Sequence, residues 1–220
     1  SWLTRRSRWR ICSGRLPQRN NGFLIDFTRI FMYNKGINLP AARASKEGET
    51  IMGFFDMFKK KAEPAAPAGP IMVAADAKGA VVKMEDIPDE VFAQGILGQC
   101  CGIDPSVGEV YAPIDGEITQ APDTLHALGI QGAGGVEVLI HVGVDTVEMK
   151  GDGFVAKVKL GDKIKKGQLL LKMDLDKIKA AGHPAVVITV ITNTDDFASV
   201  DLVASGDVEP GADMLKITKG

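Results

Sequence analysis

The chain has 220 residues, of which 45% are hydrophobic and 6% aromatic, enough for an aliphatic core in one large domain or two small ones. Its net charge of −2 is unevenly distributed, because residues 1–51 carry ten Lys/Arg and three Asp/Glu whereas residues 52–220 carry sixteen and twenty-five. The three cysteines lack a disulfide framework and no apolar run approaches the roughly 20 residues that span a bilayer, so a disulfide-stapled secreted domain and a helical membrane protein are both excluded.

Residues 1–51 mix Arg, Asn, Trp and Phe without a helical or strand period. A basic arm of this kind could bind nucleic acid or target the chain. However, Lys46-Glu-Gly-Glu lies just before Met52, and its codons can spell a purine-rich ribosome-binding sequence. We therefore expect Met52 to be the initiator, and 1–51 to be a translated leader or a disordered basic segment outside the fold, with no nucleic-acid partner.

Residues 52–70 divide into an apolar and basic tail and a linker. Four apolar residues, Phe54, Phe55, Met57 and Phe58, precede three consecutive lysines that end at Lys61. A short helix of this composition can lie on an anionic membrane surface, although a disordered tail is an equal alternative. Glu63–Pro70 is rich in Pro and Ala, a composition that predicts a semi-rigid linker. The folded domain is expected to span 71–220.

Short apolar runs in 71–220 are interrupted by Gly, Pro and Asp every eight to twelve residues, which predicts an all-β sandwich or barrel. Helical character is confined to Asp89–Leu97 and Leu175–Ala181. The expected strands are Ile71–Ala74, Ala80–Lys83, Cys101–Ile103, Glu109–Ala112, Gly116–Gln120, Thr124–Gln131, Val136–Val142, Phe154–Lys157, Leu169–Met173, Ala185–Thr192 and Met214–Thr218.

A weak internal repeat accompanies this pattern. Ala75–Val81 and Ala112–Ile118 share the pattern Ala-x3-Gly-x-Val/Ile. Val158–Met173 contains two glycine turns of its own, at Gly161 and Gly167. We expect a compact antiparallel sandwich built from a duplicated hybrid of interlocked hairpins, with one or two short helices.

Two of the three histidines, His126 and His141, flank the glycine-rich stretch Gly132–Gly135. Apolar and β-branched residues on both sides of this stretch predict a hairpin. If its turn is symmetric about Ala133 and Gly134, the two imidazoles lie directly opposite each other, with Cβ atoms about 4.5–5.5 Å apart. A register shifted by one residue would place them on opposite faces.

The runs Thr124-Leu-His-Ala127 and His141-Val-Gly-Val-Asp-Thr-Val-Glu-Met-Lys-Gly-Asp-Gly-Phe154 resemble the glucose-family enzyme IIA of the bacterial phosphoenolpyruvate-dependent sugar phosphotransferase system. The resemblance covers about 71–220 and includes Ile87–Ala93, Val110–Ile118 and Pro184–Val190. It implies a cytoplasmic phosphocarrier, a transferase component, that is peripheral to the membrane if the 52–61 tail binds there. It requires no cofactor beyond the transient phosphoryl group.

By this resemblance, His141 would accept a phosphoryl group from phospho-HPr and pass it to a cysteine on the IIB domain of a sugar permease. Neutral imidazole is a nucleophile at neutral pH, and His126 could donate an N–H to the phosphoryl oxygens. The family assigns to the residue at Thr124 the orientation of His126. Regulatory targets are a further class of partner in some members.

The resemblance also implies a docking surface around the histidines. Asp89 and Asp145 would form a polar rim that steers a basic partner, although the carboxylate of Asp145 could also be a strand-end group without a role. Gln94 and Gln99-Cys100 depart from the family pattern, which bears on partner preference, and Cys100 and Cys101 are expected to be small packing residues. The expected apolar collar comprises Val91, Phe92, Ile96, Leu97, Leu139 and Val147, of which the helical members could instead be ordinary core.

Two other functions would use different parts of the sequence. Gly161–Lys177 resembles the half-motif of lipoyl and biotinyl carrier domains, with Lys177 as the modified lysine, but this leaves the histidine hairpin unexplained. A zinc site could use His126 and His141, yet zinc prefers three or four ligands and only Asp145 or Glu137 could join them locally. Zinc bridging the two histidines and a partner's carboxylate remains a secondary expectation.

Overall fold

The computed structural model describes residues 69–220, so the expectations for 1–51 and for 52–68 lie outside the described residues. Within the described part of the chain, no helix is long and apolar enough to cross a membrane. The fold is mostly antiparallel β-structure with two short α-helices, which confirms the predicted class.

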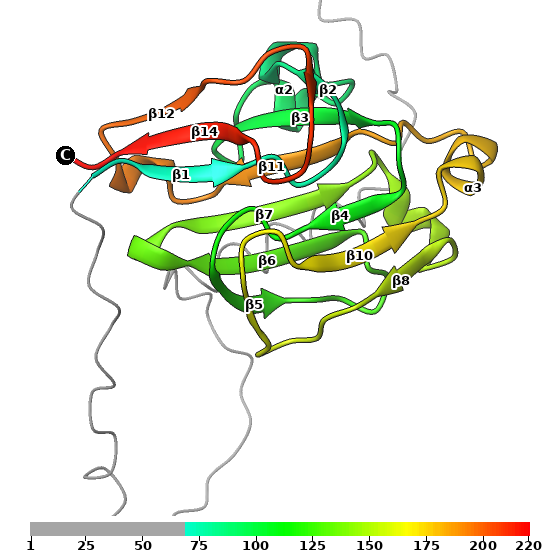
Figure 1. Ribbon diagram of the computed structural model, residues 1–220. Coiled ribbons are helices and arrows are strands. Elements are labelled where there is room, and N and C mark those ends of the chain that lie inside the picture. The colour runs from blue at the N-terminus through cyan, green and yellow to red at the C-terminus, as the bar shows by residue number, and fades with distance from the viewer. Residues whose placement is uncertain (1–68) are drawn as a thin grey trace, which may run out of the picture. The chain divides into compact units, whose positions relative to one another are not determined.

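Fourteen strands form three sheets in the described residues (Figure 1). The largest has the order β13-β2-β3-β11-β7-β6-β5-β9, and two three-stranded sheets have the orders β1-β14-β12 and β4-β10-β8. The strands are β1 (Ile71–Ala74), β2 (Gly79–Val82), β3 (Gln99–Pro105), β4 (Glu109–Tyr111), β5 (Gly116–Gln120), β6 (Ala127–Gly132), β7 (Glu137–Val142), β8 (Phe154–Ala156), β9 (Lys163–Ile164), β10 (Leu169–Met173), β11 (Val187–Ile191), β12 (Ser199–Leu202), β13 (Asp207–Val208) and β14 (Asp213–Thr218).

Short helices and 3-10 turns connect the strands. The α-helices are α2 (Glu90–Ala93) and α3 (Leu175–Ala180), and the 3-10 turns are η1 (Met84–Asp86), η2 (Ala133–Gly135), η3 (Thr146–Met149) and η4 (Thr194–Asp196). The predicted helix Asp89–Leu97 is too long, because Gln94 leaves helical geometry and Gly95 has a φ of 64°. Strands β9, β12 and β13 were not predicted, since β9 and β13 have two residues each and no side chain of β12 is fully buried.

The two segments of the internal repeat lie against each other. Ala74 N donates to Pro113 O at 2.9 Å, and Tyr111 N donates to Asp76 O at 2.7 Å. Each repeat also exchanges two backbone hydrogen bonds with a glycine turn, Ala75 with 211–212 and Ala112 with 167–168. The repeat therefore corresponds to two interlocked hairpins, as the pattern predicted.

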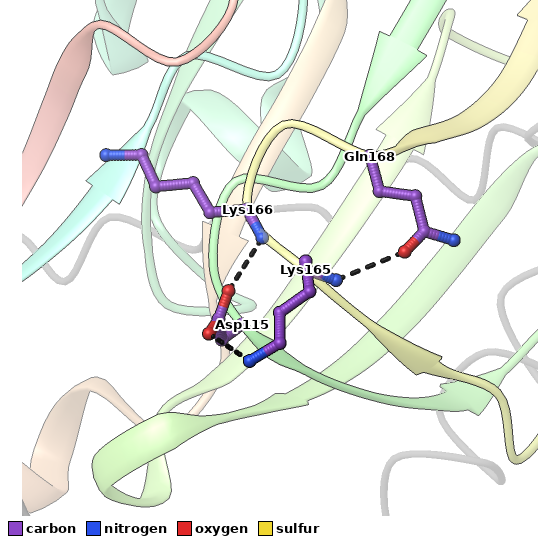
Figure 2. Close-up of polar contacts among 4 residues, drawn as sticks. All are labelled: Asp115, Lys165, Lys166 and Gln168. Atoms are coloured by element: carbon purple, nitrogen blue, oxygen red, sulfur yellow. Dashed lines mark hydrogen bonds and ion pairs between the residues drawn. The ribbon is translucent and has the colours of Figure 1, made fainter.

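The turn that contains Gly167 is also bonded to the repeat segment Ala112–Ile118 through a carboxylate (Figure 2). Asp115 accepts hydrogen bonds from Lys165 Nζ and from Lys166 N, both at 2.8 Å. Lys165 N donates to Gln168 Oε1 at 3.2 Å, which closes the turn. The Lys165 hydrogen bond, followed by that from Lys166, lowers the pKa of Asp115. Because these groups are solvated, the contact orients the turn more than it stabilises the fold.

The hairpin of β6 and β7 has a different register from the one expected. Its turn has three residues, Ala133–Gly135, and is closed by a hydrogen bond of 2.7 Å from Gly132 N to Val136 O. Positive φ angles of 76° at Gly134 and 84° at Gly135 permit this longer turn.

Symmetry about Gly134 places Ala127, and not His126, opposite His141. The expected direct pairing of the histidines is therefore wrong by one residue. The histidines meet nevertheless, because His126 precedes β6 in a bend that follows Leu125, whose φ is 53°. The period of two does not extend through this bend, so the shifted register does not separate the rings.

The core between the sheets is aliphatic, with one buried carboxylate. Asp76 has no solvent exposure and accepts a hydrogen bond of 2.7 Å from Thr189 Oγ1. It occupies the repeat position that Pro113 holds in the other hairpin. Burial raises the pKa of Asp76 to about 6 from 3.8, against a smaller lowering by the Thr189 bond.

We predict that Asp76→Asn flattens the pH dependence of the free energy of unfolding. Because the folded-state pKa is raised, Asp76 favours folding at low pH and this contribution is lost as pH rises from 3.8 to about 6. The variant should gain about 2–3 kcal/mol relative to wild type between pH 4 and pH 7. Urea unfolding at each pH measures this difference. Asp195→Asn, which removes an exposed carboxylate, is the control, and equal slopes for wild type and Asp76→Asn would contradict the assignment.

Candidate functional site

His141 lies on a central strand of the eight-stranded sheet and is 6% exposed. Its neighbours in the sheet are Ala127 on β6 and Ile188 on β11. Its Nδ1 lies 2.7 Å from Gly143 O. A carbonyl oxygen can only accept, so Nδ1 carries the proton and the lone pair of the neutral ring is on Nε2. The backbone thereby selects one tautomer of His141.

Gly143 can turn its carbonyl toward the ring because it adopts a φ of 77°. A Cβ at this position would lie 2.4 Å from Thr146 Cγ2, so there is no room for a side chain. The backbone is held by a hydrogen bond from Gly143 N to Val186 O at 3.0 Å, and Thr146 Oγ1 donates to Val142 O at 2.5 Å. The backbone conformation around Gly143 therefore fixes the direction of the Gly143 carbonyl.

His126 approaches His141 from the bend before β6. The ring centroids are 5.4 Å apart and the ring planes are inclined by 74°. Thr124 Oγ1 lies 2.6 Å from His126 Nδ1, so the hydroxyl contacts Nδ1 and not Nε2. The main chain closes the corner with a hydrogen bond of 2.7 Å from Val142 N to His126 O. The structure thus brings Thr124, His126 and His141 together.

Both imidazoles are largely removed from solvent. Burial, together with the neighbouring His126, lowers the pKa of His141 to about 4 from 6.5, and the bond to Gly143 opposes this shift. Burial likewise lowers the pKa of His126. Desolvation disfavours the charged imidazolium, so both rings are neutral at physiological pH. A neutral His141 can act as a nucleophile through Nε2.

Helix α2 covers one side of His141. The ring of Phe92 is 6% exposed and its centroid lies 5.1 Å from that of His141, at an interplanar angle of 59°. Ile96, which follows the helix, is 62% exposed. Among the other expected collar residues, Leu139 is buried on β7, whereas Val91, Leu97 and Val147 are half-buried. The expected collar therefore has a buried part at the histidines and an exposed part near Ile96.

The two expected rim carboxylates have different surroundings. Asp89 Oδ1 accepts hydrogen bonds from Val91 N at 2.8 Å and from Phe92 N at 3.1 Å, so it caps the start of α2. Asp145 is exposed, has a φ of 57° and precedes η3 without a side-chain capping bond. The carboxylate of Asp89 is thus used in capping α2, whereas the carboxylate of Asp145 faces solvent.

Sequence reasoning missed the role of Gly143 and Thr146 in holding His141. A glycine between Val142 and Val144, directly after an apolar strand, was the available signal, because an isolated glycine often marks close approach of the backbone. Which atom its carbonyl would meet depends on the φ angle and could not be deduced from spacing alone.

The alternative sites have less support. Lys177 lies in helix α3 with its Nζ 2.6 Å from Asp152 Oδ1, and it is not at the tip of a hairpin. Within residues 69–220, no three His, Cys, Asp or Glu side chains lie close enough together to hold a metal ion. The two histidines alone would supply fewer ligands than zinc prefers.

We predict that Gly143→Ala destabilises the fold and disturbs the tautomer of His141. A methyl group at a φ of 77° costs about 1–3 kcal/mol, and here it also meets Thr146. The matched control is Gly135→Ala, whose φ is 84° and whose Cβ would have no atom within 4 Å. Chemical unfolding gives the stabilities and ¹⁵N NMR of the imidazole reports the tautomer. If both variants lose equal stability and leave His141 unchanged, the contact with Thr146 has no role.

Comparison with known proteins adds to this geometry. Residues 71–197 match the family described as phosphoenolpyruvate-dependent sugar phosphotransferase system, EIIA 1. The chain is 41% identical over 165 residues to the PTS system glucose-specific EIIA component of Halalkalibacterium halodurans, covering 75% of this chain and 95% of the relative. It is 42% identical over 139 residues to the PTS system beta-glucoside-specific EIIBCA component of Dickeya chrysanthemi, covering 63% of this chain and 22% of the relative.

A solved structure agrees with the sequence comparisons. The chain superimposes on glucose permease IIA from Mycoplasma capricolum with a TM-score of 0.61 and 30% sequence identity. The superposition covers 67% of this chain and 95% of that structure.

Proposed function

The chain belongs to the EIIA 1 family of the phosphoenolpyruvate-dependent sugar phosphotransferase system, and on this premise we propose that His141 is the residue that carries its phosphoryl group. The chain is accordingly a phosphocarrier of sugar uptake, and a transferase component of that system. The observation that carries the assignment of His141 is its hydrogen bond to Gly143 O, which puts the lone pair on Nε2. A lipoyl or biotinyl carrier function through Lys177 is not supported.

The transfer at His141 is a displacement at phosphorus. The lone pair of Nε2 attacks the phosphoryl group, a P–N bond to His141 forms, and the bond to the donor breaks with its electrons left on the donor. Nδ1 keeps its proton throughout, because the N–H donates a hydrogen bond to the Gly143 carbonyl. Catalysis of such a transfer depends mainly on positioning and on stabilisation of charge at the equatorial oxygens. The fixed ring supplies the first of these.

We propose that His126 stabilises the charge at the phosphoryl oxygens. If the Thr124 hydroxyl donates to Nδ1, the ring is the tautomer with its proton on Nε2, which can donate to a phosphoryl oxygen of His141. A donor held in place by Thr124 requires no reorganisation when charge develops. We assign His126 to stabilisation of the phosphoryl group and Thr124 to orientation of His126.

We propose phospho-HPr as the donor and a cysteine of a permease IIB domain as the acceptor. Relatives such as the EIIBCA component of Dickeya chrysanthemi carry the EIIA part in one chain with permease parts, which supports a permease as partner. In the second transfer, a cysteine thiolate attacks phosphorus, the P–S bond forms and Nε2 of His141 recovers its lone pair. Regulatory targets are a further proposed class of partner.

The docking face comprises the apolar collar around the histidines. Ile96 is its most exposed member and the half-buried Val91, Leu97 and Val147 complete its outer part. An apolar surface of this kind excludes water from the phosphoramidate and can accept an apolar helix. Asp145 would attract a basic partner, whereas Asp89 acts chiefly through the helix that it caps. Zinc held by His126, His141 and a partner's carboxylate is a secondary proposal for the same face.

The proposed division of the chain follows the sequence. Residues 71–220 form the EIIA domain, 52–70 a tail and linker, and 1–51 a leader or basic segment outside the fold. The apolar and basic run Met52–Lys61 would hold a cytoplasmic protein at an anionic membrane surface. The domain should therefore work peripherally at the inner face of the membrane.

We predict that His141→Ala abolishes phosphate incorporation. The protein would be incubated with phosphoenolpyruvate, enzyme I and HPr, and acid-labile phosphate measured by intact mass. His183→Ala, which removes the histidine to which no role is assigned, should incorporate phosphate like wild type. Undiminished phosphate on His141→Ala, or none on wild type, would refute the assignment.

We predict that His126→Gln accepts phosphate but transfers it onward poorly. Nε2 of His141 is unchanged in this variant, whereas the fixed donor to the phosphoryl oxygens is altered, and loss of such a donor typically costs about 10²–10³ in rate. Rapid-quench transfer from the phosphorylated variant to a purified IIB domain measures the second step. Onward transfer at the wild-type rate would remove the role assigned to His126.

A further inference from the structure

Helix α2 is too short to hold itself in place. It has four residues, Glu90–Ala93, and an isolated helix of this length is unstable in water. The ring that it presents to His141, that of Phe92, therefore depends on contacts outside the helix. Two side chains provide such contacts, one at each end of the helix.

The first contact is at the start of α2, where the Asp89 carboxylate accepts hydrogen bonds from Val91 N and Phe92 N. The second involves the neighbouring sheet. Cys100 on β3 has its Sγ 3.4 Å from Phe92 O, and the thiol is the donor because a carbonyl oxygen can only accept. Both backbone groups of Phe92 are thus bonded from outside the helix.

Cys100 lies on the same face of the sheet as His141. It pairs with Val190 on β11, which pairs with Leu139 on β7, two residues before His141. Cys101 points to the opposite face and pairs with Thr189 in the core. A continuous series of contacts therefore runs from β3 through the Cys100 thiol and Phe92 to the reactive ring.

The thiol suits this role because it remains protonated. Cys100 is 6% exposed, and burial raises its pKa to about 12. It is consequently a hydrogen-bond donor and not a thiolate at physiological pH. The Phe92 carbonyl is also bonded by Gly95 N at 2.9 Å, so the thiol adds a tether to the sheet that the helix itself lacks.

We propose that Cys100 is a positioning residue for phosphoryl transfer: its thiol ties the Phe92 carbonyl to β3 and so holds the Phe92 ring against His141. This proposal rests on the proposed function of His141. The ring contact limits the orientations of the imidazole, and a small displacement of a reacting group can cost a large factor in rate. Cys100 acts through Phe92 and does not touch the phosphoryl group.

The test compares three substitutions at Cys100 in the full chain. Cys100→Ala and Cys100→Val both remove the donor, the first with a smaller side chain than Cys and the second with a larger one, so an effect that they share does not come from a change of volume in one direction. Cys100→Ser keeps a donor. Cys101→Ala is the matched control, since it removes the neighbouring buried thiol from the opposite face.

Aromatic NMR gives the first readout. The Phe92 ring current shifts the ring protons of His141, and Phe92→Leu supplies the reference without it. The Ala and Val variants should move the His141 signals toward this reference while backbone amide signals distant from α2 are unchanged. Cys100→Ser and Cys101→Ala should retain the wild-type signals. Wild-type His141 signals in both donor-less variants would overturn the proposal.

Phosphorylation by phospho-HPr gives the second readout. Loss of the tether should lower kcat about three- to tenfold with little change in KM, and Cys100→Ser should restore most of it. A change in KM alone would overturn the proposal, because it would place Cys100 in partner binding. If wild type accepts no phosphate, the proposed function fails, whereas the NMR comparison still decides whether Cys100 holds Phe92.

Discussion

The hydrogen bond from His141 Nδ1 to Gly143 O is the contact on which the chemistry proposed for this protein depends. It sets the tautomer, and therefore the nitrogen that can react, without using any side chain other than the histidine itself. A main-chain carbonyl cannot rotate away or titrate, so the selection persists whichever partner is present. This hydrogen bond requires a glycine at position 143, because the residue that provides the carbonyl adopts a φ of 77° and has no room for a Cβ.

The surrounding sheet makes this arrangement rigid. β7 lies between β6 and β11 and is hydrogen-bonded on both edges. The main chain beyond β7 is bonded to residues 184–186, so the turn that carries Gly143 continues the sheet's support. The interlocked repeat hairpins close the other side of the core. His141, the proposed phosphoryl acceptor, is therefore held in place by the sheet before any transfer.

Two buried titratable groups, His141 and Asp76, affect stability in opposite senses. The pKa of His141 is lowered, so its contribution is present above 6.5 and is lost as pH falls toward 4. The pKa of Asp76 is raised, so its contribution is present below 3.8 and is lost as pH rises toward 6. Their windows overlap, and each partly offsets the other in mildly acidic conditions. Desolvation by burial is the largest cause of both pKa shifts.

Much of this protein could be predicted from residue pattern alone. Short apolar runs separated by Gly, Pro and Asp predicted the all-β class, because strand length and turn-forming residues are local properties of the chain. The echo between Ala75–Val81 and Ala112–Ile118 predicted the interlocked hairpins, and the runs around His126 and His141 predicted the family. Fixed spacing in sequence was sufficient for each of these. Three-dimensional packing was not needed to infer them.

Only the tertiary structure decided how the site is assembled. The three-residue turn changed the pairing of β6 with β7, and the bend after Leu125 still returned His126 to His141. Asp89 caps helix α2, and the Cys100 thiol is hydrogen-bonded to Phe92 O. These contacts join residues through turn angles and side-chain directions that neighbouring strands impose. A pattern read along one strand contains the residue types, but the geometry between strands determines which atoms meet.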